Sequence, residues 1–159
     1  MNIFKGVINV ILTLIIVVGG IFITLYFFGI TPYVVLSGSM EPTIKTGSLS
    51  FINKNIKLQD IKENDIIGFK IGSDNLVTHR VVSITLNGLT TKGDNNKVVD
   101  GGFVTNNNYV GKNIFWIPKL GFVVIAVQTP TGKIVGITSI VLLFLAGIFL
   151  GEDNKKERN

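Results

Sequence analysis

Four side chains in the middle of the chain are of the types that hydrolysis of a peptide bond requires. Ser39 stands in the run V-V-L-S-G-S-M-E-P-T, residues 34–43. A serine hydroxyl is a poor nucleophile unless a base is positioned beside it. Histidine, with an ordinary pKa of about 6.5, suits that role near neutral pH, and the chain contains one histidine, His79. A carboxylate that accepts the N–H of the base would complete the set, and Asp94 and Asp100 are the nearest acids downstream.

Each of these segments also has an ordinary structural interpretation. The S-G-S sequence is typical of a loop, and G-D-N-N is typical of a turn in which Asp and Asn bond their own backbone. His79 lies in V-T-H-R-V-V, residues 77–82, whose alternation predicts a strand that carries His79 on the same face as Val77 and Val81. A histidine on an apolar strand face is often a core residue, so only the combination of segments indicates catalysis.

Two apolar runs, one before and one after these residues, predict that the chain is anchored in a membrane. Residues 7–28 carry no charge, and a helix of that span would be roughly 33 Å long, which crosses a bilayer. Residues 29–32 offer no small-x-small cleavage site, so we expect an anchor that is not removed. The second run, residues 134–150, would be roughly 26 Å long; we expect it to span as well, with a buried or interfacial helix as the alternative.

The charges near the two runs favour one orientation. Lys5 precedes the first run, and Lys155, Lys156 and Arg158 follow the second, so we expect both termini in the cytoplasm. The predicted parts are a cytoplasmic tail with its anchor (1–30), an extracytoplasmic catalytic domain (31–133), a second transmembrane helix (134–150) and a cytoplasmic tail (151–159). The location that follows is the cell membrane, with two spans.

The middle segment is predicted to be mainly β. Short runs rich in β-branched and aromatic residues are separated by Gly, Asn and Asp at residues 49–52, 66–71, 77–85, 89–91, 109–116 and 122–127. Asn87-Gly88 predicts a type I′ hairpin turn. Core strands are the default interpretation of residues 114–125, and an interfacial position for Phe115, Trp116 and Phe122 is the alternative.

Composition excludes several functions. The chain has no cysteine, which rules out a disulfide framework, a thiolate metal site and a cysteine nucleophile. A net charge of +5 comes from scattered lysines, so we expect no nucleic-acid partner and some attraction to anionic lipid. We expect no cofactor and no metal.

Taken together and in order, the motifs resemble a known family. S-G-S-M-E-P-T, then V-T-H-R-V-V, then T-K-G-D-N-N with an Asp shortly after, all behind an N-terminal anchor, resemble type I signal peptidases. They look most like the branch of the endoplasmic-reticulum catalytic subunit, the archaeal enzymes and the SipW-like enzymes. The larger bacterial branch has a lysine where this chain has His79. The branch often carries two adjacent acids after G-D-N-N, whereas here Val99 precedes Asp100.

The resemblance implies a role for each matching residue. Ser39 matches the nucleophile and His79 the general base, while Ser37 and the Ser39 backbone N–H match the oxyanion hole. For the third member it favours Asp100, with Asp94 as structural support or as the alternative partner of the imidazole. Leu36 and Met40 would line the substrate cleft.

The activity implied is removal of N-terminal signal peptides from exported preproteins by a membrane-bound serine endopeptidase with a signal-peptidase-like β fold. The substrate would bind as an added strand, with small residues at −1 and −3. Signal peptides and the lipid bilayer are the expected partners, and accessory subunits stay undetermined.

Three other functions or mechanisms are compatible with the same residues. A metal-dependent hydrolase would use His79, Asp94 and Asp100, but one histidine and no cysteine make a poor transition-metal site. A non-enzymatic, membrane-tethered β module that binds secreted partners would not need Ser39. A Ser-Lys dyad would recruit Lys92 or Lys70 in place of His79.

Overall fold

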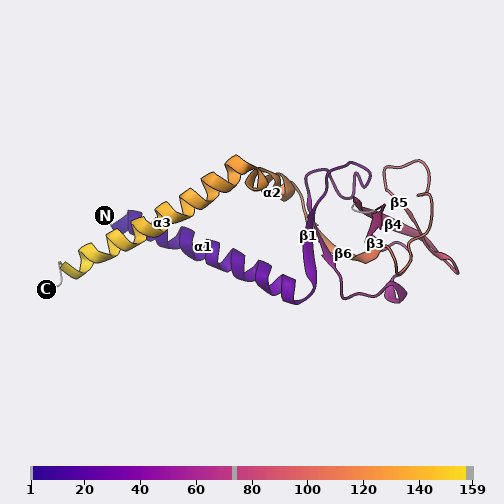
Figure 1. The fold of residues 1–159 in the computed structure, drawn as a ribbon, viewed down its shortest axis with the longest axis horizontal. Helices are drawn as coiled ribbons and strands as arrows, with labels where there is room; N and C mark the ends of the chain where they lie inside the picture. The colour runs from indigo at the N-terminus through magenta and orange to yellow at the C-terminus, as the bar shows by residue number, and fades with distance from the viewer. Residues whose placement is uncertain (1, 73–74, 157–159) are drawn as a thin grey trace. The chain divides into compact units, whose positions relative to one another are not determined.

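The computed structural model describes residues 2–72 and 75–156 (Figure 1). The chain divides into two compact units, one formed by residues 25–125 and the other by the two terminal segments. The first unit contains a six-stranded sheet, and the terminal segments are helical. The predicted fold class, a mainly β domain between two apolar helices, is confirmed.

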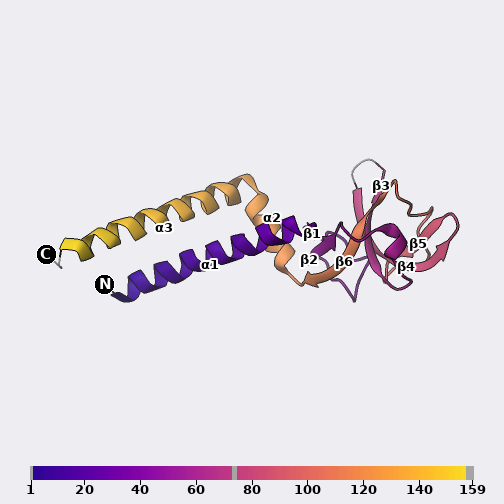
Figure 2. The same ribbon diagram turned by 90° about the horizontal axis from the view of Figure 1, so that it is seen from below.

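The sheet is antiparallel at every pairing and is ordered β1-β2-β6-β3-β4-β5. Long-range pairing brings β6, near the end of the domain, between β2 and β3. Strands β4 and β5 form a hairpin at one edge, visible in both ribbon views (Figure 1 and Figure 2). The strand bounds are β1 (Ile30–Val34), β2 (Leu49–Asn53), β3 (Ile66–Ile71), β4 (Asn75–Thr85), β5 (Gly88–Lys92) and β6 (Tyr109–Ile117).

The core lies on one face of β3, β4 and β5. Alternate residues of these strands point inward, as the two-residue period of a strand requires. The resulting cluster consists of Ile61, Ile67, Phe69, Val81, Leu89 and Val104, each at most 4% exposed. A second cluster joins the loop after β1 to the sheet through Met40, Ile44 and Ile66. The loop that carries the candidate nucleophile is therefore packed onto the domain.

The strand predicted at residues 122–127 is wrong, because helix α2 (Leu120–Gln128) occupies this segment. An unbroken apolar run has no alternation, so it fits a buried strand and a helix equally well. Pro118 lacks an amide hydrogen, and Lys119 adopts a positive φ of 65°, so the chain leaves the sheet after Ile117.

The β4–β5 hairpin is present, but its turn differs from the predicted type I′ turn. Thr85 pairs with Gly88, which leaves Leu86 and Asn87 as the connection. Among the described residues only Asn64 and Lys119 are non-glycine positions with positive φ, so Asn87 lacks the conformation that type I′ requires. Gly88, at φ 130°, is needed there, since a Cβ would lie 2.6 Å from the Val104 carbonyl oxygen.

The terminal helices are α1 (Asn2–Phe27) and α3 (Pro130–Lys156), and a short 3-10 helix, η1, covers Leu58–Asp60. Within them, Lys5–Phe27 and Pro130–Gly147 are long and apolar enough to cross a membrane. Helix α3 begins at Pro130, earlier than the predicted residue 134. Proline is favourable at the first position of a helix, because the N–H that it lacks would have no partner within the helix there. It also continues into the segment predicted as a polar tail, of which residues 157–159 lie outside the described residues.

The inner face of the sheet can be tested at Ile67, which is fully buried in the core cluster. Ile67→Ala removes three buried carbons and leaves a cavity, so the free energy of unfolding should fall by about 2–5 kcal/mol. Urea denaturation of the full chain in detergent micelles would measure this. The control Ile84→Ala, at a side chain 50% exposed on β4, should change stability by less than about 1 kcal/mol. Equal losses in both variants would contradict the assignment of the core face.

Candidate active site

Ser39 lies in a loop between β1 and β2 that is held by its own side chains. Glu41 Oε1 accepts hydrogen bonds from the Thr46 backbone N–H at 3.1 Å and the Thr46 hydroxyl at 3.0 Å. These two bonds hold the pKa of Glu41 below its ordinary value. The Ile44 N–H donates to the Met40 carbonyl at 2.9 Å, and both side chains are buried. The loop thus presents Ser39 from an anchored turn.

His79 projects from the middle of β4 toward the core. It pairs with Ile67 of β3 and lies on the same face as Val81, as the alternation predicted. Only 6% of the residue is exposed, and the edge of its ring packs against Phe69, with 6.1 Å between ring centroids. His79 Nε2 lies 3.0 Å from Ser39 Oγ. The histidine is therefore both a core residue and a neighbour of the serine.

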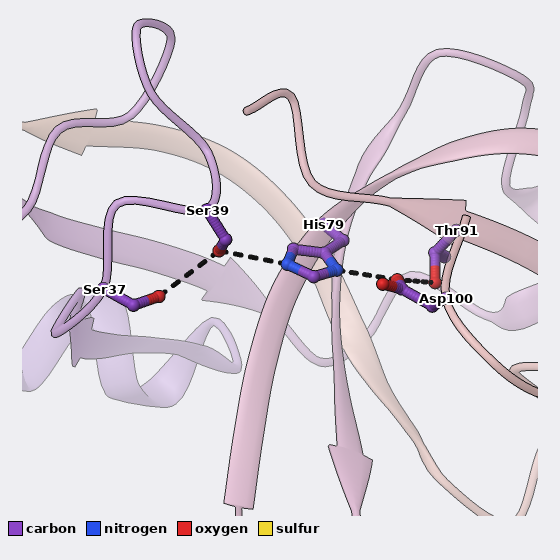
Figure 3. Close-up of polar contacts among 5 residues, drawn as sticks. All are labelled: Ser37, Ser39, His79, Thr91 and Asp100. Atoms are coloured by element: carbon purple, nitrogen blue, oxygen red, sulfur yellow. Dashed lines mark hydrogen bonds and ion pairs between the residues drawn. The ribbon is translucent and has the colours of Figure 1, made fainter. Parts of the chain in front are cut away.

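The other ring nitrogen of His79 contacts a carboxylate. Asp100 Oδ2 lies 2.6 Å from His79 Nδ1, so the imidazole bridges Asp100 and Ser39 (Figure 3). An ionised carboxylate can only accept a hydrogen bond, which puts the proton of a neutral ring on Nδ1. Nε2 is then unprotonated and can accept the Ser39 hydroxyl hydrogen. This is the arrangement in which a histidine acts as a general base.

Asp94 contacts Arg80 instead of His79. Arg80 Nε and Nη2 donate to Asp94 Oδ1 and Oδ2 at 2.8 and 2.7 Å, a two-pronged ion pair. The hydrogen bonds from Arg80 are the main reason that the pKa of Asp94 is lowered. Residues 79 and 80 are neighbours on β4 and point to opposite faces, so each aspartate meets a different side of the strand. The spacing in the sequence could not make this distinction.

The turn that contains Asp94 also holds the serine loop. The Asn95 backbone N–H donates to the Ser39 carbonyl at 2.8 Å, and Asn95 Nδ2 donates to the Gly38 carbonyl at 3.3 Å. Gly93 permits this approach, because a Cβ there would lie 2.6 Å from the Ser39 carbonyl oxygen. The roles of Gly93 and Asn95 could not be predicted from the sequence, since nothing local in G-D-N-N shows which distant loop it contacts.

A cleft of about 340 Å³ opens beside Ser39. It lies between two chain segments, residues 33–40 with Ile44 and residues 75–78 at the start of β4. Leu36 borders it with 75% of its surface exposed, whereas Met40 also borders it but is 1% exposed and belongs mainly to the core. Ser37 lies at the same cleft, with its Oγ 3.3 Å from Ser39 Oγ (Figure 3). Ser39 is therefore accessible from the cleft.

The rival interpretations find less support in this geometry. Among residues 2–72 and 75–156, no three His, Cys, Asp or Glu side chains are grouped so that they could hold a metal ion. His79, and not a lysine, contacts Ser39 Oγ. Lys70 is adjacent to the inward-facing Phe69 on β3 and is itself exposed, so it projects from the face opposite His79.

Comparison with known proteins gives consistent matches. Residues 7–113 match the family model described as signal peptidase, peptidase S26. Signal peptidase I W of Bacillus subtilis is 41% identical over 85 residues, covering 51% of this chain and 45% of that protein. The signal peptidase complex catalytic subunit SEC11 of Colletotrichum graminicola is 36% identical over 105 residues, covering 58% of this chain and 60% of its own length. The human subunit SEC11C is 37% identical over 105 residues, with coverage of 58% and 54%.

The family match covers the segments that form the site. The family match begins within α1 and ends within β6, so it includes Ser39, His79, Asp94 and Asp100. The matched regions span about half the length of these curated relatives.

The Asp94–Arg80 pair predicts a pH dependence of stability. The folded-state pKa of Asp94 is lowered, so its contribution is complete above the ordinary Asp pKa of about 3.9 and is lost as the pH falls through the lower folded-state value. Asp94→Asn should reduce the free energy of unfolding near pH 7 by about 1 kcal/mol, because the pair is only partly buried. The difference from wild type should shrink below about pH 4. Urea denaturation at several pH values checks this.

Asp60→Asn, at an exposed acid of η1, serves as the control and should change little at any pH. A loss of stability in Asp94→Asn that is equally large at pH 3 and pH 7 would contradict the ion-pair explanation.

Proposed function

The chain belongs to the signal peptidase family, peptidase S26, and from this premise we propose that it is a membrane-bound serine endopeptidase that removes N-terminal signal peptides from exported preproteins. The observation that carries the proposal is the position of His79, with Nε2 3.0 Å from Ser39 Oγ and Nδ1 2.6 Å from Asp100 Oδ2. A serine, a histidine and an aspartate in this order of contacts form a catalytic triad, an arrangement that hydrolyses amide bonds.

In the proposed first step, Ser39 Oγ attacks the scissile carbonyl carbon while its proton passes to His79 Nε2. Asp100 accepts the Nδ1 hydrogen and stabilises the imidazolium that forms. The carbonyl oxygen becomes an oxyanion, for which the Ser37 hydroxyl and the Ser39 backbone N–H are the proposed donors. The exposed Ser37 hydroxyl, 3.3 Å from Ser39 Oγ, is close enough to turn from the serine to that oxygen.

In the second step the tetrahedral intermediate collapses. The C–N bond breaks, and His79 Nε2 gives its proton to the leaving amine, which is the new N-terminus of the mature protein. A water molecule then attacks the acyl group on Ser39, again losing a proton to His79 Nε2. The bond between Ser39 Oγ and the acyl carbon then breaks, and His79 Nε2 returns its proton to Ser39 Oγ. The signal peptide leaves as a carboxylic acid, which releases its proton to solvent. Acylation and deacylation thus use the same base.

Asp94 is proposed to position the site without contacting the reacting atoms. Its carboxylate is bound to Arg80, and the next residue, Asn95, is bonded to the Ser39 carbonyl. The role of partner to the imidazole is assigned to Asp100.

The cleft beside Ser39 supports the proposed type of substrate. Its two walls are chain segments that run along the opening, with Leu36 on one side and Val77 and Thr78 on the other. A peptide bound in extended form could make backbone hydrogen bonds along such walls, with the cleft selecting side chains by size.

The two apolar helices support a proposed position in a membrane. We propose that α1 and α3 both span the cell membrane, with residues 1–30 and 151–159 containing the cytoplasmic ends and residues 31–133 outside. Residues 134–150 would form most of the second span. A signal peptide is itself an apolar segment whose cleavage site emerges at the membrane surface. Ser39 follows Phe28 by eleven residues, so the chain cannot carry it more than about 36 Å from the end of the first anchor.

Cleavage of a model preprotein by the full chain in detergent or lipid tests the proposal. Ser39→Ala and His79→Ala should each lower kcat/KM by about 10⁴-fold or more, and the double variant should be little worse than either, because the two act as a unit. Asp100→Asn should cost about 10³–10⁴-fold and Asp94→Asn much less.

Ser83→Ala, a serine on the same strand as His79, is the matched control and should retain wild-type activity. A chelator should have no effect on the wild type. If neither the wild type nor Ser39→Ala cleaved the preprotein while both bound a secreted partner, the chain would be a non-enzymatic β module and not a peptidase.

A further inference from the structure

Thr91 lies behind the three proposed catalytic residues and contacts one of them. Its side chain is on β5, and the residue is 1% exposed. Thr91 Oγ1 donates a hydrogen bond to Asp100 Oδ2 at 2.6 Å, the same oxygen that lies 2.6 Å from His79 Nδ1 (Figure 3). The direction of this bond is determined, because an ionised carboxylate has no hydrogen to donate.

The sheet register explains why Thr91 faces the histidine. Thr91 pairs with Val81 of β4, so the two side chains project from the same face. His79 precedes Val81 by two residues on β4 and therefore shares that face. The threonine hydroxyl thus reaches the site from a neighbouring strand inside the core.

Asp100, in contrast, comes from a segment without regular structure. It follows Val98 and Val99, which are 74% and 52% exposed, so the chain before it has little packing to hold it. Its backbone is fixed by one bond to the same threonine, from the Asp100 N–H to the Thr91 carbonyl at 2.8 Å. Its carboxylate could still rotate about the side-chain bonds. Besides the contact with His79 itself, the Thr91 hydroxyl opposes this rotation.

We propose that Thr91 is a positioning residue for the reaction: its hydroxyl orients the Asp100 carboxylate so that Oδ2 accepts the Nδ1 hydrogen of His79, which keeps Nε2 directed at Ser39. This inference rests on the proposed function, because it assigns Thr91 a part in the same reaction. Thr91 does not touch the reacting atoms, and it acts through Asp100.

A buried threonine can also serve only as core packing, and Thr91→Val separates the two roles. Valine has nearly the same shape as threonine and lacks the hydroxyl, so the substitution keeps the filled volume and removes the hydrogen bond to Asp100. If the hydroxyl orients Asp100, kcat for the model preprotein should fall by about 10- to 100-fold, the range expected for a hydrogen bond to a charged group. KM should change by less than about threefold, because the substrate cleft is untouched.

A second pair of variants covers the possibility that the valine disturbs folding. Thr91→Ser and Thr91→Ala both lack the methyl group and differ only in the hydroxyl. Thr91→Ser should retain kcat within about threefold of wild type, and Thr91→Ala should lose as much as Thr91→Val. Combining Thr91→Val with Asp100→Asn should cost little more than Asp100→Asn alone, because Thr91 acts through the carboxylate.

The outcomes are distinct. An inactive wild type, or cleavage that survives in Ser39→Ala, contradicts the proposed function and this inference with it. Cleavage that requires Ser39 but has an unchanged kcat in Thr91→Val, or falls equally in the Ser and Ala variants, overturns the inference alone. A multiplicative loss in the Thr91→Val and Asp100→Asn double variant also overturns it.

Discussion

The ring of His79 has two nitrogens, and the site depends on giving each of them the correct neighbour. Nε2 needs a hydroxyl to accept from, and Nδ1 needs a carboxylate to donate to. A buried, nearly enclosed imidazole cannot turn to correct a misplaced partner, so Ser39 and Asp100 must be brought to it. The surrounding contacts hold these two side chains at the two nitrogens of the ring.

The loop that carries Ser39 is held by hydrogen bonds within itself and by a turn from another part of the chain. The serine loop is closed internally by Glu41 and Thr46 and externally by Asn95, whose N–H donates to the Ser39 carbonyl. Asp94, next to Asn95, is paired with Arg80 on the outer face of the same strand that carries His79. A single strand therefore positions His79 on one face and, through the other face, restrains the turn that holds the Ser39 loop. Gly93 is required at this junction because a side chain would meet the Ser39 carbonyl.

Much of this could be predicted from the sequence, and the remainder depends on contacts between distant segments. The β-branched and aromatic content of residues 66–71 and 77–85 predicted β3 and β4. The alternation in residues 77–82 predicted that His79 shares a face with Val81, because strand periodicity is a local property. The run at residues 122–127 has no alternation, so its helix could not be distinguished from a strand. Asp94 and Asp100 are both near enough in sequence to meet His79, and only the opposite faces of β4 separate them. Thr91 and Asn95 gave no signal, since a threonine in a strand and an asparagine in a turn are ordinary residues there.

Because the chain has one histidine, nuclear magnetic resonance of the full chain with ¹⁵N-labelled histidine reports on this ring alone. We expect the neutral ring to carry its proton on Nδ1 and this proton to exchange slowly with solvent. Asp100→Asn should remove the protection from exchange, and Ser39→Ala should shift the Nε2 resonance. A neutral ring protonated on Nε2, or a ring proton that exchanges as fast as in free histidine, would contradict the bridge between Asp100 and Ser39.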